Sequence, residues 1–364
     1  MKKSIAILGT RGIPARYGGF ETFADELSRR LVKKGKEVSV YCEKCGSESG
    51  VFEYEGVKLE YIRTFPLGPF RTILFDLICL WHARNRFDVI YLLGYGAALF
   101  AFIPRLWGKQ VWINVDGIEW RRTKWNDLAK VYFKIMEFFS TITPDRIIAD
   151  AEGIKNYFVG KYKRLPPCTF IPYGAPLITE SQSNDYLKSL GLCRGGYYLV
   201  VARLEPENHV REIIEGYSRY HSKRPLLIVG GLTPNNDYVA ELKELESERV
   251  RFLGGIYNVE KLQSLRINSF AYFHGHSVGG TNPSLLEALG CGNLIVAHDN
   301  VFNREVAGDV GYYFETTEDI RRILEELEET SADNISALSK QALLRIVDKY
   351  NWDLVVKSYL DLLK

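Results

Sequence analysis

Short runs of β-forming residues alternate with helix-like runs along almost the whole chain, and this alternation restricts the fold more than any other feature. The pattern is typical of parallel sheets covered by helices on both faces, because each parallel connection has to cross the sheet. A polar, glycine-containing stretch over residues 175–196 interrupts it once. The sequence therefore predicts an α/β protein with two doubly wound, Rossmann-like domains.

The predicted elements set the domain limits. The expected strands of the first domain are 4–9, 37–42, 57–63, 88–94, 110–115, 146–150 and 169–174, and those of the second are 197–203, 225–231, 250–255, 269–275 and 293–299. We expect an N-terminal domain over 1–178, a C-terminal domain over 179–345, and an amphipathic helix over 346–364 that crosses back to the N-terminal domain. Ligands of such proteins bind at the carboxyl ends of the strands, so the chemistry is expected in the loops that follow them, in a cleft between the domains.

Length and composition agree with a folded, two-domain enzyme. The chain has 364 residues, whereas single cores stop growing at roughly 250. The apolar stretch from Val89 to Trp107 contains two glycines and a proline, which favours a buried strand, a loop and the start of a helix over a membrane span. The N-terminal apolar run is too short for a signal peptide. We therefore expect a cytoplasmic protein.

Charge is unevenly distributed. Residues 1–178 hold 27 Lys and Arg against 18 Asp and Glu, and the remainder holds 20 against 27. This asymmetry indicates that the first domain meets an anionic partner such as a membrane surface or a pyrophosphate, although ordinary variation in surface charge is an alternative. A peripheral position at the inner face of the membrane follows, and no nucleic-acid partner is expected. Cys42 and Cys45 lack a second ligand pair, so no metal is expected.

The loop after the first strand, residues 9–22, is rich in glycine. Its candidate binding residues are Gly18 and Gly19, together with Arg11, Arg16 and Tyr17. Glycines before a helix expose backbone amides to a phosphate or a sugar hydroxyl. A nicotinamide site, with Glu43 on the ribose, is an alternative, but the spacing is not that of G-x-G-x-x-G. A purely structural loop is another.

Two further loops carry charged residues after strands. Asp116 and Glu119 follow the fifth strand and could hold substrate hydroxyls or orient an attacking group, or could form a turn and pair with Arg121 or Arg122. Arg203 ends the first strand of the second domain, where its guanidinium could bind two phosphate oxygens. A surface pair with Glu205 or Glu207 is the alternative for Arg203.

The fourth loop, in the stretch HGHSVGGTNPSLLEALGCG (274–292), predicts an anion site at a helix N-terminus. Gly279 and Gly280 leave the backbone bare, and Asn282 and Pro283 are favourable first residues of a helix. A diphosphate could lie on the amides of Thr281, Ser284 and Leu285. Glu287, one turn further on, could accept hydrogen bonds from a ribose, or could pair with a nearby arginine.

Together the four loops resemble retaining glycosyltransferases of the GT-B architecture, family four, over essentially the whole chain. The segments GTRGIPARYGGFET, VDGIEW, VARLEPEN and GHSVGGTNPSLLEAL are similar to a bacterial rhamnosyltransferase subgroup. The resemblance implies transfer of L-rhamnose from dTDP-rhamnose to a lipid-pyrophosphate-linked saccharide in cell-wall, capsular or O-antigen polysaccharide synthesis. It also implies that Gly18 and Gly19 lie near the donor phosphate and the acceptor, Arg203 on the diphosphate and Glu287 on the ribose.

Three positions depart from the family pattern. Gly279 stands where the first acid of E-x7-E is usual, Asn208 where a diphosphate-binding lysine is usual, and Asp116 where many relatives carry a histidine. Loss of the first acid is compatible with a 6-deoxy sugar and equally with lost activity.

The predicted mechanism needs neither a cofactor nor a metal. Arg203 and the helix over 282–290 neutralise the leaving diphosphate, and the acceptor attacks from the face that the leaving group departs from. A nucleotide-sugar epimerase of the same fold and a non-catalytic nucleotide-sugar-binding protein are the alternatives.

Overall fold

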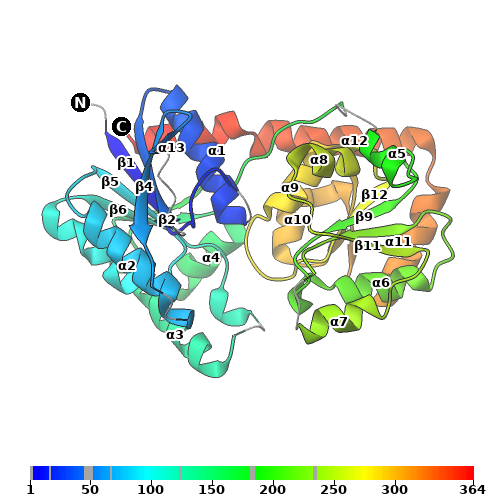
Figure 1. Ribbon diagram of the computed structural model, residues 1–364, viewed down its shortest axis with the longest axis horizontal. Coiled ribbons are helices and arrows are strands. Elements are labelled where there is room, and N and C mark those ends of the chain that lie inside the picture. Colours follow the sequence, from blue (N-terminus) through cyan, green and yellow to red (C-terminus); the bar gives the residue numbers. More distant parts are fainter. Residues whose placement is uncertain are drawn as a thin grey trace. The chain divides into compact units, whose positions relative to one another are not determined.

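The protein consists of two compact units, shown in Figure 1. The structure is a computed structural model that describes residues 3–15, 18–44, 52–65, 68–122, 125–180, 185–232 and 236–364. Unit 1 comprises Met1–Tyr173 and Trp352–Lys364, and unit 2 comprises Gly174–Asn351. The chain therefore leaves unit 1 after Tyr173 and returns to it at Trp352, whereas the sequence placed these passages at 178 and 345.

Unit 1 is built on a sheet with the strand order β3-β4-β2-β1-β5-β6-β7-β8. Its strands are β1 (Ser4–Leu8), β2 (Glu37–Lys44), β3 (Glu53–Tyr54), β4 (Val57–Arg63), β5 (Val89–Leu93), β6 (Gln110–Asn114), β7 (Arg146–Ala149) and β8 (Cys168–Phe170). Its helices are α1 (Gly19–Lys33), α2 (Arg71–Ala83), α3 (Asp127–Ser140), α4 (Glu152–Lys161) and α13 (Trp352–Leu362), with short helical turns η1 (Gly68–Phe70), η2 (Ala98–Phe102), η3 (Pro104–Trp107) and η4 (Glu119–Arg121). All paired strands are parallel except β3 and β4.

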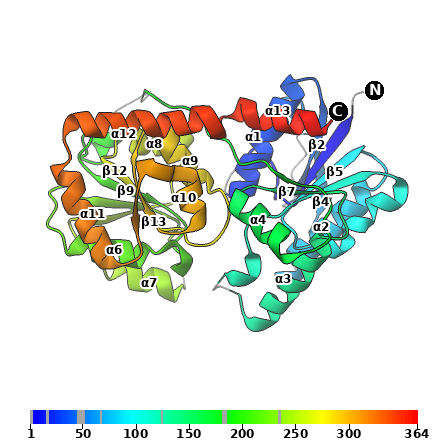
Figure 2. The same cartoon turned by 180° about the vertical axis from the view of Figure 1, so that it is seen from behind.

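The last helix of the chain, α13, completes the core of unit 1. It lies beside α1 in both views (Figures 1 and 2). The buried hydroxyls of Tyr359 and Tyr91 are 2.8 Å apart, and Phe23 of α1 packs against the rings of Tyr359 and Trp352. Removing these aromatic rings from water is what holds the terminal helix on the first sheet.

Unit 2 is built on a fully parallel sheet with the order β11-β10-β9-β12-β13-β14. Its strands are β9 (Tyr198–Val201), β10 (Leu226–Val229), β11 (Val250–Gly254), β12 (Ala271–His274), β13 (Leu294–His298) and β14 (Gly311–Phe314). Its helices are α5 (Asp185–Ser189), α6 (Val210–Ser218), α7 (Asp237–Lys243), α8 (Val259–Asn268), α9 (Pro283–Gly290), α10 (Val301–Ala307), α11 (Thr317–Glu329) and α12 (Ala332–Arg345), with turns η5 (Pro206–Asn208), η6 (Gly308–Val310) and the π-helical η7 (Ile346–Tyr350).

The predicted fold class is confirmed, because helices cover both faces of two mainly parallel sheets (Figures 1 and 2). The short strands β3 and β14 were not anticipated. Residues 94–107, expected to turn into a helix after a buried strand, form the turns η2 and η3. No described helix has the length and hydropathy to cross a bilayer.

Both sheets reverse their strand order at one point, and these points determine where loops can form a site. In unit 1 the reversal lies between β1 and β5, and in unit 2 between β9 and β12. At such a point two neighbouring strands send their connections to opposite faces, which leaves a crevice at the carboxyl edge.

Candidate functional site

In unit 2, the loops 202–209 and 275–282 follow the neighbouring strands β9 and β12 and are tied together. The side-chain amide of Asn208 donates to the carbonyl oxygen of Arg203 at 2.7 Å, and its Oδ1 lies 2.5 Å from His276 Nδ1. The backbone and hydroxyl of Ser277 both donate to the carbonyl oxygen of Glu207 at 3.0 Å. A Cβ at Gly275 would lie 2.0 Å from the carbonyl oxygen of Asn208. The two loops thus form one rigid structure.

The ties also define the roles of Asn208 and His276. Because the amide nitrogen of Asn208 is committed to a carbonyl oxygen, its Oδ1 faces His276 and can only accept. In this hydrogen bond His276 Nδ1 therefore carries the proton. Asn208 is buried. It occupies the position where the family that the sequence resembles usually has a diphosphate-binding lysine. In this protein it holds the two loops together.

Arg203 lies on the surface of this structure. Its side chain is 40% exposed, and Nη1 is 3.2 Å from Glu205 Oε1. This is the surface pair that the sequence left open as an alternative. A half-exposed pair of this kind contributes about 1 kcal/mol or less, so the guanidinium remains able to turn toward an anion.

The start of α9 corrects one prediction. The amides of Ser284 and Leu285 are not bare, because Asn282 accepts the Ser284 amide through Oδ1 at 2.9 Å and the Leu285 amide through its carbonyl at 3.2 Å. Asn282 and Pro283 do begin the helix as predicted, and this capping is the reason that those amides are occupied. Thr281 is buried and also has a partner. What remains for an anion is the positive end of the helix dipole.

Gly279 has a backbone conformation that explains the missing acid. Its φ is +123°, and a Cβ there would lie 3.1 Å from His276 Nε2. An L-residue would be strained at this φ. The loop therefore does not accommodate the acid of the family pattern without rearrangement, and the imidazole of His276 lies next to the position that a side chain would occupy. Gly280 beside it is buried.

Glu287 is held by an arginine that the sequence analysis did not identify. Its Oε2 is 2.6 Å from Nη2 of Arg266, whose side chain is only 4% exposed. Arg266 also donates to Ser284 Oγ at 3.3 Å, and that oxygen is 2.6 Å from the hydroxyl of Tyr272. The pairing with an arginine, one of the two predicted roles, is present. Since a carboxylate has room for several hydrogen bonds, the 30% exposed Glu287 keeps an oxygen edge for a hydroxyl group.

Histidines gather at this edge of the second sheet. His209 and His298 stack with ring centroids 4.3 Å apart, and the rings of His274 and His276 are 6.0 Å apart. Burial lowers the pKa of His274 to about 3, and burial with the nearby His209 lowers the pKa of His298 to about 4. Both rings are therefore neutral near pH 7. In the described part of the chain, no group of three or more His, Cys, Asp or Glu is arranged to hold a metal ion.

In unit 1, the loop after β1 folds back on acids of α1. The amide of Arg11 donates to Glu21 Oε1 at 3.1 Å, and the amide of Ala15 donates to Asp25 Oδ2 at 2.8 Å. Gly18 is the N-cap of α1 with a φ of 111°, and Gly19 begins the helix. The predicted residues Arg16 and Tyr17 lie outside the described residues. Neither acid was identified from the sequence, although both lie in the first two turns of the predicted helix.

The acidic residues after β6 have different surroundings. Asp116 is half-buried directly beyond the strand. Glu119 is committed to local contacts, because its Oε1 is 2.8 Å from Arg122 Nε and its Oε2 accepts from the indole of Trp125 at 3.3 Å. Its amide donates to the hydroxyl of Tyr95 at 2.7 Å. Glu119 thus shows the turn and pairing role that was its alternative, whereas the role of Asp116 stays a prediction.

Two family models match the chain, one in each unit. Residues 2–176 match the family described as "Domain of unknown function (DUF1972)", and residues 194–342 match "Glycosyl transferases group 1". The second of these matches makes residues 194–342 similar to glycosyl transferases of group 1. Arg203, Asn208, His276 and Glu287 all lie within these matched residues. No curated protein matched the sequence.

Solved structures cover almost the entire chain at low sequence identity. Sucrose-phosphate synthase from Thermosynechococcus elongatus is 16% identical with a TM-score of 0.82, over 99% of this chain and 98% of that one. Anabaena HepE in complex with UDP-glucose is 16% identical with a TM-score of 0.80, over 99% of both chains. A glycosyltransferase from Rickettsia africae is 14% identical with a TM-score of 0.76, over 100% and 98%. These likenesses show the fold, two α/β domains with parallel sheets as in GT-B enzymes.

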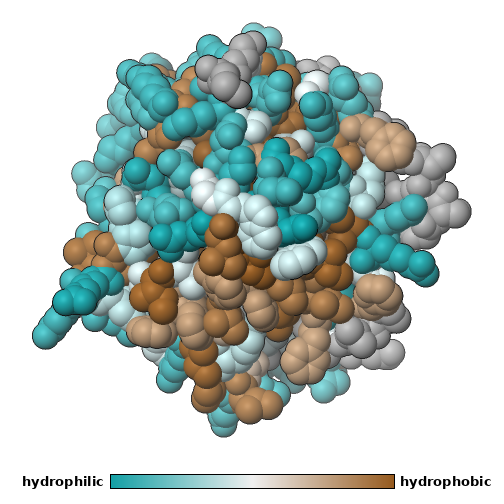
Figure 3. All heavy atoms as spheres, turned by 90° about the vertical axis from the view of Figure 1, so that its left-hand side faces the viewer, coloured by the Kyte–Doolittle hydropathy of each residue, from teal (hydrophilic) through white to brown (hydrophobic). Residues whose placement is uncertain are grey.

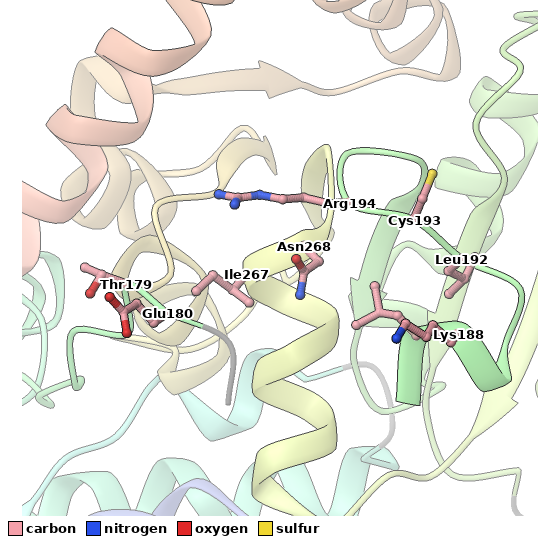
Figure 4. Close-up of a pocket in the computed structure, with 9 residues that line it drawn as sticks. Thr179, Glu180, Lys188, Leu192, Cys193, Arg194, Ile267 and Asn268 are labelled. Atoms are coloured by element: carbon pink, nitrogen blue, oxygen red, sulfur yellow. The ribbon is translucent and has the colours of Figure 1, made fainter. Parts of the chain in front are cut away.

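A hollow elsewhere in unit 2 does not belong to this site. It has a volume of about 570 Å³ and is lined by residues that precede β9 and β12, among them Lys188, Arg194 and Asn268 (Figure 4). These residues lie at the amino edge of the sheet, whereas ligands of parallel sheets bind at the carboxyl edge. The candidate site of unit 2 therefore lies on the loops after β9 and β12.

Proposed function

We propose that the protein is a glycosyltransferase that moves a sugar from a nucleotide-sugar donor to a lipid-pyrophosphate-linked saccharide. The proposed donor is dTDP-L-rhamnose, and the proposed pathway is cell-wall, capsular or O-antigen polysaccharide synthesis. The observation that carries the proposal is the joining of the loops after β9 and β12 around Asn208, beside Arg203 and the start of α9. The group 1 match over residues 194–342 supports the reaction class.

In this proposal, unit 2 binds the donor. Arg203 leaves Glu205 and binds the diphosphate, while the positive end of α9 lies against it. Glu287, oriented by the buried Arg266, accepts a hydrogen bond from the sugar ring of the nucleoside. Anabaena HepE, which is similar in fold, was solved with UDP and with UDP-glucose, which favours a nucleotide sugar as ligand here.

The reaction follows from where negative charge develops. As the glycosidic bond to the diphosphate breaks, charge accumulates on the leaving oxygen, and Arg203 with the helix end stabilises it. These groups can supply that stabilisation without a metal. The proposed stereochemical outcome is retention, with the acceptor attacking on the face from which the diphosphate departs. Unit 1 is the proposed acceptor-binding part, through the loop after β1 and Asp116.

A 6-deoxy sugar suits position 279. The glycine there has no side chain to bind a sugar hydroxyl, and its φ of +123° disfavours any replacement. A donor that lacks one hydroxyl group needs one partner fewer. This supports rhamnose over glucose as the transferred sugar.

The test is a transfer assay with a panel of nucleotide sugars and a lipid-pyrophosphate-linked saccharide, read by mass spectrometry. The expected product has gained one deoxyhexose from dTDP-L-rhamnose, with unchanged yield in a chelator. Conversion of the donor sugar without acceptor would indicate an epimerase. Tight donor binding without turnover over the panel would indicate a non-catalytic binding protein.

A lipid-linked acceptor requires access to a membrane. We therefore also propose that the protein works at the cytoplasmic face of an anionic membrane, as a peripheral protein. The excess of Lys and Arg over Asp and Glu in residues 1–178 supports this, since anionic lipids attract such a surface.

A further inference from the structure

Helix α3 of unit 1 carries a row of apolar side chains on its exposed side. We call this row the α3 stripe; it consists of Leu128, Val131, Ile135 and Phe138 on the helix and Ile142 just beyond it. Their exposed fractions range from 47% to 82%. The spacing of three and four residues places them on one face. Most helices of a soluble protein turn such a face inward.

The opposite face of α3 is anchored, so the stripe has to face outward. Glu137 is fully buried and accepts hydrogen bonds from the indole of Trp120 at 2.8 Å and the ammonium group of Lys161 at 2.6 Å. The hydroxyls of Tyr157 and Tyr162 donate to the same carboxylate at 3.1 and 2.7 Å. Rotating the helix to bury the stripe would expose or break this network, which is costly for a buried charge.

The stripe continues onto neighbouring elements. Turn η2, which packs against α3, exposes Phe102, and η3 exposes Leu106 and Trp107. The ring of Trp107 meets that of Trp81 on α2 at a centroid distance of 6.1 Å. Figure 3 shows apolar side chains gathered across the lower middle of this side of the protein. The α3 stripe with these four residues is called the apolar face, and it is larger than scattered surface residues would produce.

Cations adjoin the apolar face. The guanidinium of Arg84 lies 4.2 Å and 5.2 Å from the ring centroids of Trp81 and Trp107. On α3, Lys130 and Lys134 directly precede the stripe residues Val131 and Ile135. The ammonium nitrogen of Lys134 lies 4.7 Å from the ring centroid of Trp120. Long cationic side chains and tryptophans beside an apolar surface are typical of proteins at a membrane interface.

We infer that the apolar face is the surface by which the protein inserts shallowly into an anionic lipid bilayer, with the stripe among the acyl chains and Arg84, Lys130 and Lys134 among the headgroups. An exposed apolar helix face that is flanked by cations and tryptophans can lie in the plane of the membrane interface, with its apolar residues at the boundary of the acyl chains. A second copy of the chain would also fit the three-and-four spacing, but it would bring like-charged lysines together. The inference says where on the protein the proposed membrane contact lies. It rests on the proposed function only for the reason that the protein needs a membrane.

The test is cosedimentation of the full chain with phosphatidylcholine vesicles that contain or lack phosphatidylglycerol, without donor or acceptor. The variant Leu128→Ser/Ile135→Ser is expected to lower the partition coefficient on anionic vesicles roughly tenfold or more. The matched control is Val259→Ser/Val301→Ser, which removes two apolar side chains exposed by 64% and 60% in unit 2 and is expected to leave binding unchanged. Lys130→Gln/Lys134→Gln is expected to weaken binding only on anionic vesicles.

Two results would overturn the inference. One is equal vesicle binding by the wild type and Leu128→Ser/Ile135→Ser. The other is a lipid-free dimer in sedimentation equilibrium that this variant converts to a monomer, which would assign the face to a second copy. The vesicles contain no donor or acceptor, so vesicle binding tests the role of the apolar face even if the transfer assay fails. A variant that loses vesicle binding is expected to keep transfer to a short-chain, detergent-solubilised acceptor.

Discussion

Helices α1 and α9 both begin at the point where their sheet reverses its strand order, yet their first turns are chemically different. At α1, Glu21 and Asp25 accept hydrogen bonds from the amides of the preceding loop. At α9, the cap is the neutral Asn282 and the first turn has no acid. A phosphate would be repelled by the carboxylates at the start of α1. It would be attracted by the positive dipole end at the start of α9, where no acid is present. The difference supports the proposal that unit 2 binds the donor diphosphate and that the loop after β1 meets sugar hydroxyl groups.

The largest expected effects come from glycines that allow close backbone contact at the two reversal points. A Cβ at Gly9 would lie 2.1 Å from the carbonyl oxygen of Leu93, and one at Gly275 would lie 2.0 Å from that of Asn208. Gly9→Ala and Gly275→Ala are each expected to destabilise their own unit by about 3 kcal/mol or more. Hydrogen exchange followed by mass spectrometry reports the two units separately.

Gly160 supplies the control for these variants. Nothing lies within 4 Å of a Cβ built there, near the end of α4. Gly160→Ala is therefore expected to stabilise unit 1 by about 0.4 to 1 kcal/mol. If all three variants behaved alike, close packing at the reversal points would not be what these glycines provide.

The second prediction concerns buried ionisable groups, whose pKa values are shifted in opposite directions in the two units. Burial raises the pKa of Asp76 in α2 to about 8, whereas burial lowers the pKa of His274 to about 3. Asp76 binds a proton in the folded state that it has lost in the unfolded state above pH 4. Unit 1 should therefore lose stability as the pH rises from about 4 to 8, by about 1.4 kcal/mol per pH unit. Unit 2 should lose stability as the pH falls below about 6.5, where an unfolded His274 gains a proton.

Asp76→Asn tests the acidic half of this comparison. In the wild type, unit 1 is expected to lose about 2 to 3 kcal/mol of stability between pH 6 and 8. The variant should abolish this loss and leave unit 2 unaffected. Hydrogen exchange measured across this pH range gives the comparison directly. A wild-type unit 1 whose stability does not change between pH 6 and 8 would contradict the assignment.

The third prediction sharpens the anion-site assignment. Arg203→Ala should weaken dTDP binding by about 1.5 to 3 kcal/mol, because a charge-assisted hydrogen bond is lost, with little change in the melting temperature. Isothermal titration calorimetry measures the affinity. Arg211 is the matched control, since it is 41% exposed and paired with one acid, Glu241. Wild-type affinity in Arg203→Ala, or an equal loss in Arg211→Ala, would remove Arg203 from the site.

The smallest expected effect concerns Glu287. Glu287→Gln keeps the shape but weakens the contact with Arg266 and with a nucleoside hydroxyl, so the affinity for dTDP should fall by about 1 kcal/mol. The affinity for inorganic pyrophosphate should stay unchanged, because pyrophosphate has no sugar. Calorimetry with both ligands distinguishes the two roles, and equal losses would indicate that Glu287 acts on the whole site through Arg266.

Local sequence patterns predicted part of the candidate site. Asn282 and Pro283 start α9 because capping preferences act over three or four neighbouring residues. Asn282 takes the amide of Ser284 with its side chain and that of Leu285 with its backbone carbonyl, and a capping preference itself implies such an occupation. Arg266 was missed because one cation among several polar residues of a helix gives no signal of what it meets in space.

The sequence alone determined the two doubly wound units, because the spacing of β-branched and apolar residues dictates which segments become strands and helices. It also determined which loops follow the strands, and hence the carboxyl edge at which chemistry is expected. Only the tertiary structure decided that Arg266 meets Glu287, that His276 stands beside Gly279, and that α3 presents an apolar side outward. These contacts join residues on different elements, and their energies depend on burial and geometry that exist only once the sheets have formed.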